Sequence, residues 1–175
     1  SHTSFSDLQE RLKANKLPLG VTSLLYGAPG TGKTETVYQI AKKYNRPIFK
    51  VEIAETKSMW FGESQKLVKK IFTDYYEYKK DEKVCPILLF NEADAIIGKR
   101  KNAGATSVAD TENAIQNILL EELENFKGIL FATSNLVNNL DPAFERRFLF
   151  KIKFDTPSPE NAAKIWKSKL PMISN

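Results

Sequence analysis

Cysteine, histidine and long apolar runs are scarce in this chain of 175 residues. Its single cysteine, Cys85, cannot form an internal disulfide, and we expect it to be buried as a small apolar residue in a reducing, intracellular (cytoplasmic) compartment. The single histidine, His2, lies at the extreme N-terminus and is assigned no role. No apolar run approaches the ~20 residues that a membrane-spanning helix needs, and no secretory segment opens the chain, so we expect neither a membrane span nor export.

The chain carries a modest excess of positive charge. Lysine and arginine outnumber aspartate and glutamate by 26 to 21, which gives a formal net charge of +5. Most lysines are spread along the polar faces of predicted helices, and charge distributed in this way is typical of solvated surface. The one dense basic cluster, Lys99–Lys101, falls in a predicted polar loop. Net charge alone therefore does not indicate a nucleic-acid partner.

Patterns typical of strands alternate with patterns typical of helices. Short apolar runs predict strands at residues 23–26, 47–53, 86–90, 128–133 and 149–154. Apolar positions with a helical period predict helices at residues 35–44, 63–78, 111–126 and 158–170, and residues 98–110 are expected to form a polar loop. The run at 86–90 is apolar throughout, as expected of a strand buried on both faces. The alternation predicts a three-layer α/β fold with a mostly parallel sheet, in one domain.

Residues 27–34, Gly-Ala-Pro-Gly-Thr-Gly-Lys-Thr, form a complete phosphate-binding loop between a predicted strand and a predicted helix. Its glycines let backbone N–H groups turn toward phosphate oxygens, and the helix N-terminus adds partial positive charge. We expect Lys33 to reach the β- and γ-phosphates and the Thr34 hydroxyl to ligate Mg²⁺. A chance glycine-rich turn is the alternative, but the order strand, loop, helix favours a nucleotide site. The predicted nucleotide contacts are Ala28, Pro29, Gly30, Thr31, Gly32, Lys33, Thr34 and Glu35.

Further along the chain lie candidates for the other groups that nucleotide hydrolysis needs: a catalytic base, a sensor of the γ-phosphate and an arginine. The apolar run 87–90 ends in the polar pair Asn91-Glu92, and the run 131–134 ends in Asn135. The segment 141–148 contains the adjacent pair Arg146-Arg147. Taken singly, the asparagine fits a turn residue and the arginines fit surface charge. Their order behind an intact phosphate-binding loop favours the catalytic interpretation.

Together these segments resemble the successive motifs of the AAA+ ATPases, most closely the branch that remodels proteins. They are Gly27–Thr34, Leu88–Asp94, Ala132–Asn135 and Leu140–Phe148. The resemblance implies a P-loop NTPase fold, with a five-stranded sheet in the order 5-1-4-3-2 flanked by helices. It also implies ATP, ADP and Mg²⁺ as ligands, and hexameric rings of identical subunits that share ATP sites between neighbours.

The resemblance further implies a role for each motif residue. The loop residues keep the roles given above, Glu92 would be the catalytic base, and Asn135 would be sensor 1. Arg146 and Arg147 resemble the arginine fingers that enter a neighbouring subunit's site. The family usually separates its two arginines by a couple of residues, whereas here they are adjacent, and the spacing from Asp141 favours Arg146.

Asn91 departs from the family pattern, which normally has an aspartate here that helps to hold Mg²⁺ through its water shell. An amide keeps hydrogen-bonding ability but lacks the negative charge. The metal site should therefore be weaker by about 1–2 kcal/mol, on the scale of hydrogen bonds to charged groups. Because Glu92 is intact, we expect an ATPase with weakened Mg²⁺ handling, and a non-hydrolysing nucleotide switch is the alternative.

Residues 59–64, Met-Trp-Phe-Gly-Glu-Ser, resemble the family's first pore loop, which grips a polypeptide in the central channel. Trp60, Phe61 and Gly62 would form that loop, because an exposed tryptophan offers a large, sequence-tolerant contact surface. The alternative is that Trp60 and Phe61 pack beneath the next helix. The basic cluster Lys99–Lys101 would correspond to the second pore loop.

We therefore expect residues 1–155 to form the nucleotide-binding core, and residues 156–175 to form a linker and the first helix of a lid that is largely missing. The expected function is ATP hydrolysis coupled to remodelling or threading of protein substrates. A nucleic-acid-linked loader of the same superfamily is the alternative that the Trp60 segment disfavours.

Overall fold

The computed structural model describes residues 2–13, 20–52, 60–98, 107–136 and 138–155. Its helices are α1 (His2–Lys13), α2 (Lys33–Lys43), α4 (Trp60–Lys80), α5 (Asp94–Ile97), α6 (Ser107–Glu124) and α7 (Pro142–Arg147). Its strands are β1 (Val21–Gly27), β2 (Ile48–Glu52), β3 (Ile87–Asn91), β4 (Ile129–Ser134) and β5 (Phe150–Phe154). The predicted linker and lid helix, at residues 156–175, lie outside the described residues, as does the basic cluster Lys99–Lys101.

In the described part of the chain, five strands form one sheet in the order β2-β3-β4-β1-β5. All neighbouring strands are parallel. This is the order 5-1-4-3-2 read from the other edge, so the predicted fold class is confirmed. The parallel arrangement brings the carboxyl ends of β1, β3 and β4 to the same edge of the sheet, where ligands bind in open α/β sheets.

The central strands β1, β3 and β4 are buried along almost their whole length, because both of their faces are covered. On β1, Leu24 packs into one hydrophobic cluster and Leu25 into the other. On β4, Leu130 and Phe131 divide in the same way. Side chains alternate between the two faces of a strand, so a run of apolar residues feeds both layers at once. The prediction drawn from the run at 86–90 is confirmed, because every residue of β3 is buried.

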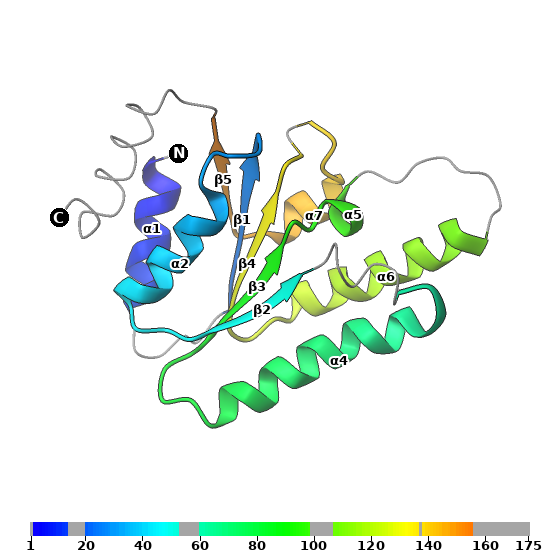
Figure 1. Cartoon of the computed structure of the whole chain (residues 1–175), viewed down its shortest axis with the longest axis horizontal. Helices are drawn as coiled ribbons and strands as arrows, with labels where there is room; N and C mark the ends of the chain where they lie inside the picture. Colours follow the sequence, from blue (N-terminus) through cyan, green and yellow to red (C-terminus); the bar gives the residue numbers. More distant parts are fainter. Residues whose placement is uncertain (1, 14–19, 53–59, 99–106, 137, 156–175) are drawn as a thin grey trace.

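Two layers of helices complete the core (Figure 1). The helices α4 and α6 lie side by side over one face, and α1 and α2 lie over the other. Under α4 and α6, an aromatic group is formed by Phe72, Tyr75, Phe90 and Phe126, whose neighbouring rings lie 5.5–5.9 Å apart. The largest fully buried side chains include Tyr75 and Phe72 from α4.

Helix α1 is an element that the sequence analysis did not predict. Phe5, Leu8 and Leu12 recur at helical spacing and are 2%, 0% and 1% exposed. Arg46 secures the helix by donating to the carbonyl oxygens of Leu12 and Cys85, at 2.8 and 2.9 Å. Cys85, expected to be buried, is only partly so, because it lies just ahead of β3 at the margin of the core.

Element bounds differ from the predicted ones mainly at helix starts. Helix α4 begins at Trp60 rather than at residue 63, and α6 begins at Ser107 rather than at residue 111. The short helices α5 and α7 were also not predicted, because each has too few residues to show a periodic pattern.

Gly27 ends β1 at a close approach to the neighbouring edge strand. Its φ is 144°, and a Cβ atom built there would lie 2.0 Å from the carbonyl oxygen of Phe154. Gly30, three residues on, has a φ of 76° but no atom within 4 Å of such a Cβ. The first glycine of the loop is therefore required by packing as well as by conformation, and the second by conformation alone.

This difference gives a stability prediction. Gly27→Ala should lower the free energy of unfolding by about 2–5 kcal/mol, because backbone strain and a backbone clash act together. The matched control Gly30→Ala should cost about 1–2 kcal/mol, because only the left-handed backbone is penalised. Urea unfolding of the two variants measures the difference, and equal costs would contradict the close approach.

Candidate functional site

The loop between β1 and α2 has the backbone of an anion site. Gly30 and Gly32 adopt φ values of 76° and 88°, in the left-handed region that suits glycine. Gly32 precedes the first residue of α2, and no side chain caps this helix N-terminus. Thr31 closes the loop by donating its hydroxyl to the carbonyl oxygen of Ala28 at 2.8 Å. A left-handed loop that leads into an uncapped helix suits a phosphate group.

Lys33 places a cation inside this loop. The residue is 7% exposed, and its Nζ donates to the carbonyl oxygens of Gly27 and Ala28 at 2.8 and 2.7 Å. Burial lowers the pKa of Lys33 from its usual value, and the nearby carboxylates of Asp94 and Glu92 oppose the shift. An ammonium held against uncharged carbonyl oxygens is well suited to exchange them for a phosphate anion.

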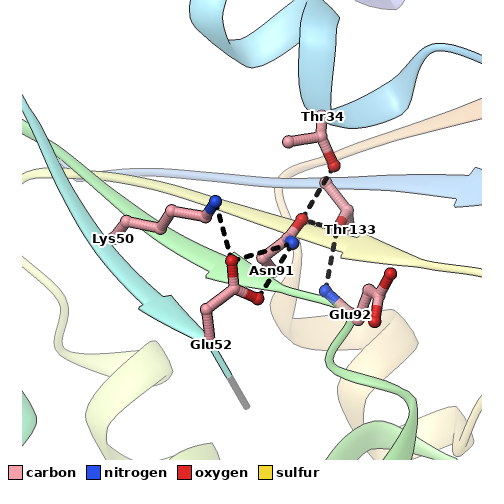
Figure 2. A network of polar contacts seen from close by, with 6 residues as sticks. All are labelled: Thr34, Lys50, Glu52, Asn91, Glu92 and Thr133. Atoms are coloured by element: carbon pink, nitrogen blue, oxygen red, sulfur yellow. Dashed lines mark hydrogen bonds and ion pairs between the residues drawn. The ribbon is translucent and has the colours of Figure 1, made fainter. Parts of the chain in front are cut away.

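Asn91 is the centre of a polar network at the carboxyl end of β3 (Figure 2). Its Oδ1 accepts hydrogen bonds from Thr34 Oγ1 at 2.7 Å and from Thr133 Oγ1 at 3.0 Å. The Thr133 oxygen in turn accepts from the backbone N–H of Glu92 at 2.9 Å. The first turn of α2, the end of β3 and the end of β4 are therefore joined through one amide oxygen.

The other end of the same amide faces β2 (Figure 2). Asn91 Nδ2 donates to Glu52 Oε2 at 3.1 Å, with Oε1 at 3.4 Å, and Lys50 Nζ lies 2.7 Å from Glu52 Oε1. The hydrogen bond from Lys50, followed by that from Asn91, lowers the pKa of Glu52 against the opposing effect of burial. Hydrogen bonds with Glu52 and then with Tyr38 raise the pKa of Lys50. Glu52 is thus held as a carboxylate.

Glu92, the predicted base, has an unusual backbone and an accessible side chain. Its φ is 53°, which costs a residue other than glycine about 1–2 kcal/mol. The hydrogen bond from its N–H to Thr133 holds the backbone in this conformation. Its side chain is exposed, so the carboxylate can reach a water molecule.

Asn135, the predicted sensor, lies just past the end of β4. Its backbone N–H donates to both carboxylate oxygens of Asp94, at 3.1 and 3.2 Å, and the residue is exposed. Asp94 opens α5, and Ala93 before it donates its N–H to the carbonyl oxygen of Thr133 at 2.8 Å. The structure thus brings Asn135 to the edge of the sheet that carries Asn91 and the phosphate-binding loop.

The two candidate arginines lie together at the end of α7 but differ in their surroundings. Arg147 is drawn back to its own chain, where its Nη2 lies 3.8 Å from Glu124 Oε2 of α6. Arg146 is exposed. Asp141 caps α7 by accepting from the N–H of Ala143 at 2.9 Å, which explains why a helix begins here.

The predicted pore-loop residues Trp60, Phe61 and Gly62 form the start of α4. Met59 and the cluster Lys99–Lys101 lie outside the described residues. The assignment of Trp60–Gly62 to a substrate-gripping loop stays a prediction.

The donor set fits a metal ion that is held largely by nucleotide and water. Across the described residues, no group of three or more histidine, cysteine, aspartate or glutamate side chains could hold a metal ion. Magnesium in nucleotide sites usually keeps several waters and takes few protein ligands. The hydroxyl of Thr34, beside Asn91, is the candidate ligand that fits this chemistry.

Glu52, Lys50 and Thr133 are site residues that the sequence analysis did not identify. The register of the sheet pairs Glu52 with Asn91, which lies 39 residues away in sequence. The sequence did contain a signal for Glu52, because Glu52 and Asn91 are polar residues at the ends of two neighbouring parallel strands.

No helix of the described part of the chain is long and apolar enough to cross a membrane.

Comparison with known proteins gives matches over most of the chain. Residues 23–156 match the family model described as "ATPase family associated with various cellular activities (AAA)". The 26S proteasome regulatory subunit 7 homolog of Saccharomyces cerevisiae is 33% identical over 160 residues, which cover 86% of this chain and 32% of the relative. The ATP-dependent zinc metalloprotease FtsH 1 of Conexibacter woesei is 32% identical over 156 residues, which cover 86% of this chain and 23% of the relative.

A solved structure gives the same match in three dimensions. A chain in the HORMA:CdnC:Trip13 complex of E. coli MS115-1 aligns with a TM-score of 0.63 and 26% identity, over 85% of this chain and 52% of that one. The present chain spans less than half of the length of the curated relatives that it matches.

The Thr133 hydroxyl provides a test of the network. Thr133→Val should lower the free energy of unfolding by about 1–3 kcal/mol, because it removes the acceptor of the Glu92 N–H and one of the two hydrogen bonds to Asn91 Oδ1. It should also speed hydrogen exchange at the Glu92 amide, which NMR can follow.

Thr22 of β1 is a matched control, since its buried hydroxyl donates to the carbonyl oxygen of Arg147 and accepts from the N–H of Leu149, at 3.1 and 3.0 Å. Thr22→Val should cost a similar free energy without exposing the Glu92 amide. Unchanged exchange at Glu92 in Thr133→Val would refute the network.

Proposed function

The chain belongs to the AAA family of ATPases, and on that premise we propose that it binds ATP with Mg²⁺ and hydrolyses it to ADP. The observation that carries this proposal is the network centred on Asn91 Oδ1, which accepts from Thr34 directly and is linked through the Thr133 hydroxyl to the backbone N–H of Glu92. It joins a phosphate-binding loop to a candidate base across three elements of the fold. A glycine-rich loop alone would support only binding.

Each residue of the site has a task in this function. The N–H groups of the loop and Lys33 would bind the phosphates, and Lys33 would exchange its carbonyl contacts for phosphate oxygens. Thr34 would donate its proton to Asn91 Oδ1 and keep its lone pairs for the metal. When bound, Mg²⁺ supplies positive charge that offsets the charge developing on the β- and γ-phosphates.

The reaction itself needs a proton acceptor and a group that orients water. The exposed carboxylate of Glu92 would accept a proton from the attacking water. The side-chain amide of Asn135 would contact the γ-phosphate and that water. The contact between the Asn135 N–H and Asp94 holds its backbone in place.

Loss of the Lys33 ammonium tests nucleotide binding. Lys33→Ala should weaken ATP binding by about 10- to 100-fold, the scale of a hydrogen bond to a charged group. The domain should remain folded, because burial disfavours the charged form of Lys33, as its lowered pKa indicates. Removing this ammonium therefore also removes a cost of burying charge. Calorimetric titration gives the affinity, and Lys42→Ala, at an exposed position of the same helix, is the control. Equal affinities in wild type and Lys33→Ala would remove the proposed site.

We propose that Arg146 is the arginine finger, and that the working unit is a homo-oligomeric ring in which Arg146 enters the neighbouring subunit's site. Arg147 is engaged with Glu124 of its own chain, whereas Arg146 is exposed and available to a neighbour. Such an arginine stabilises the charge of the transition state.

Mixing two inactive variants tests the shared site. Arg146→Ala and Glu92→Gln should each lower turnover by about 10³-fold or more. Mixed together they should regain part of the activity, because some interfaces pair an intact arginine with an intact base. Arg147→Ala is the control and should retain most of its activity. If the wild type is active and the mixture stays inactive, Arg146 is not an arginine finger that acts in the neighbouring subunit's site.

We further propose that hydrolysis drives remodelling or threading of a protein substrate. Support comes from the similarity to a proteasome regulatory subunit and to an ATP-dependent metalloprotease. In this proposal Trp60, Phe61 and Gly62 contact the substrate, residues 1–155 form the core, and residues 156–175 begin the lid. The single cysteine supports a reducing, intracellular site of action.

The second candidate function is a nucleotide switch that binds without hydrolysing, and Asn91 is the observation that favours it. Turnover measured against Mg²⁺ concentration separates the two functions. An ATPase with a weakened metal site reaches full turnover when Mg²⁺ is raised, whereas a switch stays inactive at every concentration.

A further inference from the structure

An asparagine amide can be placed in two ways that differ by a half-turn. One presents an oxygen to a given neighbour, and the other presents an NH₂ group. At position 91 the choice matters, because one end of the amide faces Thr34, the candidate magnesium ligand. An oxygen there accepts the Thr34 proton, whereas an NH₂ group would point its positive hydrogens toward the metal side of the site.

The hydroxyl of Thr133 favours one of these placements. Its oxygen accepts the N–H of Glu92 at 2.9 Å, and its single proton is donated to Asn91 Oδ1 at 3.0 Å. A turned amide would leave that proton without its acceptor. Thr133 reports the orientation, but as a hydroxyl it can both donate and accept, so it does not enforce it.

Glu52 is the neighbour that can enforce the orientation. A carboxylate only accepts hydrogen bonds, and Glu52 Oε2 accepts from Asn91 Nδ2 at 3.1 Å. The other oxygen, Oε1, is taken by Lys50 Nζ at 2.7 Å. Lys50 also offsets the charge of Glu52, so the influence of Glu52 on the metal side is chiefly orientation and not charge.

We infer that Glu52 is a positioning residue that holds the Asn91 amide with its oxygen toward Thr34, and so lets an asparagine serve where a carboxylate would otherwise be needed. This role presupposes the proposed ATP site and adds to it a residue from the neighbouring strand. It makes the pair of side chains at positions 52 and 91 the functional unit, with one carboxylate and one amide between them.

The variant Glu52→Gln should turn the Asn91 amide over. Lys50 can only donate, so it would claim the single oxygen of the new amide at position 52 and leave an NH₂ group in the place of Oε2. That group would face the NH₂ group of Asn91, and two donors cannot hydrogen-bond to each other. The hydrogen bond is restored when the Asn91 amide turns over and presents its oxygen to position 52. The NH₂ group of Asn91 would then face Thr34 and the metal.

The variant Asn91→Asp should not repair the site by itself, although it restores the family residue. Its carboxylate would lie about as close to Glu52 as the present amide does, 3.1 Å, and like charges at that distance repel. The double variant Glu52→Gln/Asn91→Asp exchanges the two groups. The new amide at position 52 then gives its oxygen to Lys50 and its NH₂ group to the new carboxylate at position 91. The other oxygen of that carboxylate accepts from Thr34 and Thr133.

The test measures nucleotide affinity with and without the metal, and it does not depend on turnover. The dissociation constant for ADP is determined by calorimetry in excess Mg²⁺ and in EDTA, and the ratio of the two gives the gain due to Mg²⁺. In Glu52→Gln the Mg²⁺ gain should be about tenfold smaller than in the wild type, which is the scale of one hydrogen bond to a charged group. In Asn91→Asp the gain should also be smaller than in the wild type. The double variant should recover at least the wild-type gain. Affinity in EDTA should stay within about twofold throughout, which also shows that each variant keeps a folded loop.

Glu77→Gln is the matched control, since Glu77 is also paired with a lysine, Lys80 at 2.9 Å, but lies on the exposed face of α4. It should leave the Mg²⁺ gain unchanged. A wild type that binds no ADP in either condition would refute the proposed function itself. A wild type that binds ADP, together with a Glu52→Gln variant that keeps the full Mg²⁺ gain or a double variant that fails to recover it, would overturn the role of Glu52 and leave the proposed function standing.

Discussion

The pairing of β1 between β4 and β5 is the constraint on which the site depends. Every residue of β1 from Ser23 to Tyr26 has a partner on both sides, so its end cannot shift without loss of ladder hydrogen bonds on two strands. Gly27 then leaves the sheet against the backbone of Phe154, at a distance that only glycine allows. The phosphate-binding loop therefore starts from a fixed point beside the ends of β3 and β4. The polar residues at the ends of those strands are therefore close enough to the loop to contact it directly.

Much of the fold could be predicted from the sequence because the central strands of the sheet are buried on both faces. Apolar runs such as 86–90 mark their strands by composition alone, and the loop at 27–34 identifies the strand and helix on either side of it. Helix α1 was missed although Phe5, Leu8 and Leu12 have helical spacing. Its first turn has no acidic residue, which would have marked a helix start.

The candidate site was predictable only where one segment carries its chemistry. Short sequence motifs identify Lys33, Thr34 and the pair Asn91-Glu92. Glu52 does not, because its meaning depends on which residue of β3 lies opposite, and register is a property of two strands together. The effect of an asparagine at position 91 was therefore judged from its lost charge alone. The structure adds a second quantity, the direction in which the amide points.

The left-handed backbone of Glu92 has a consequence for how this position can change. A φ of 53° penalises every side chain and favours glycine, so the fold by itself would be more stable with no side chain at position 92. The proposed chemistry requires a carboxylate at that same position. Selection for thermal stability alone and selection for turnover would consequently pull residue 92 toward different amino acids. A library of variants of this chain that is selected only for thermal stability would therefore be enriched in variants that lack the carboxylate at position 92.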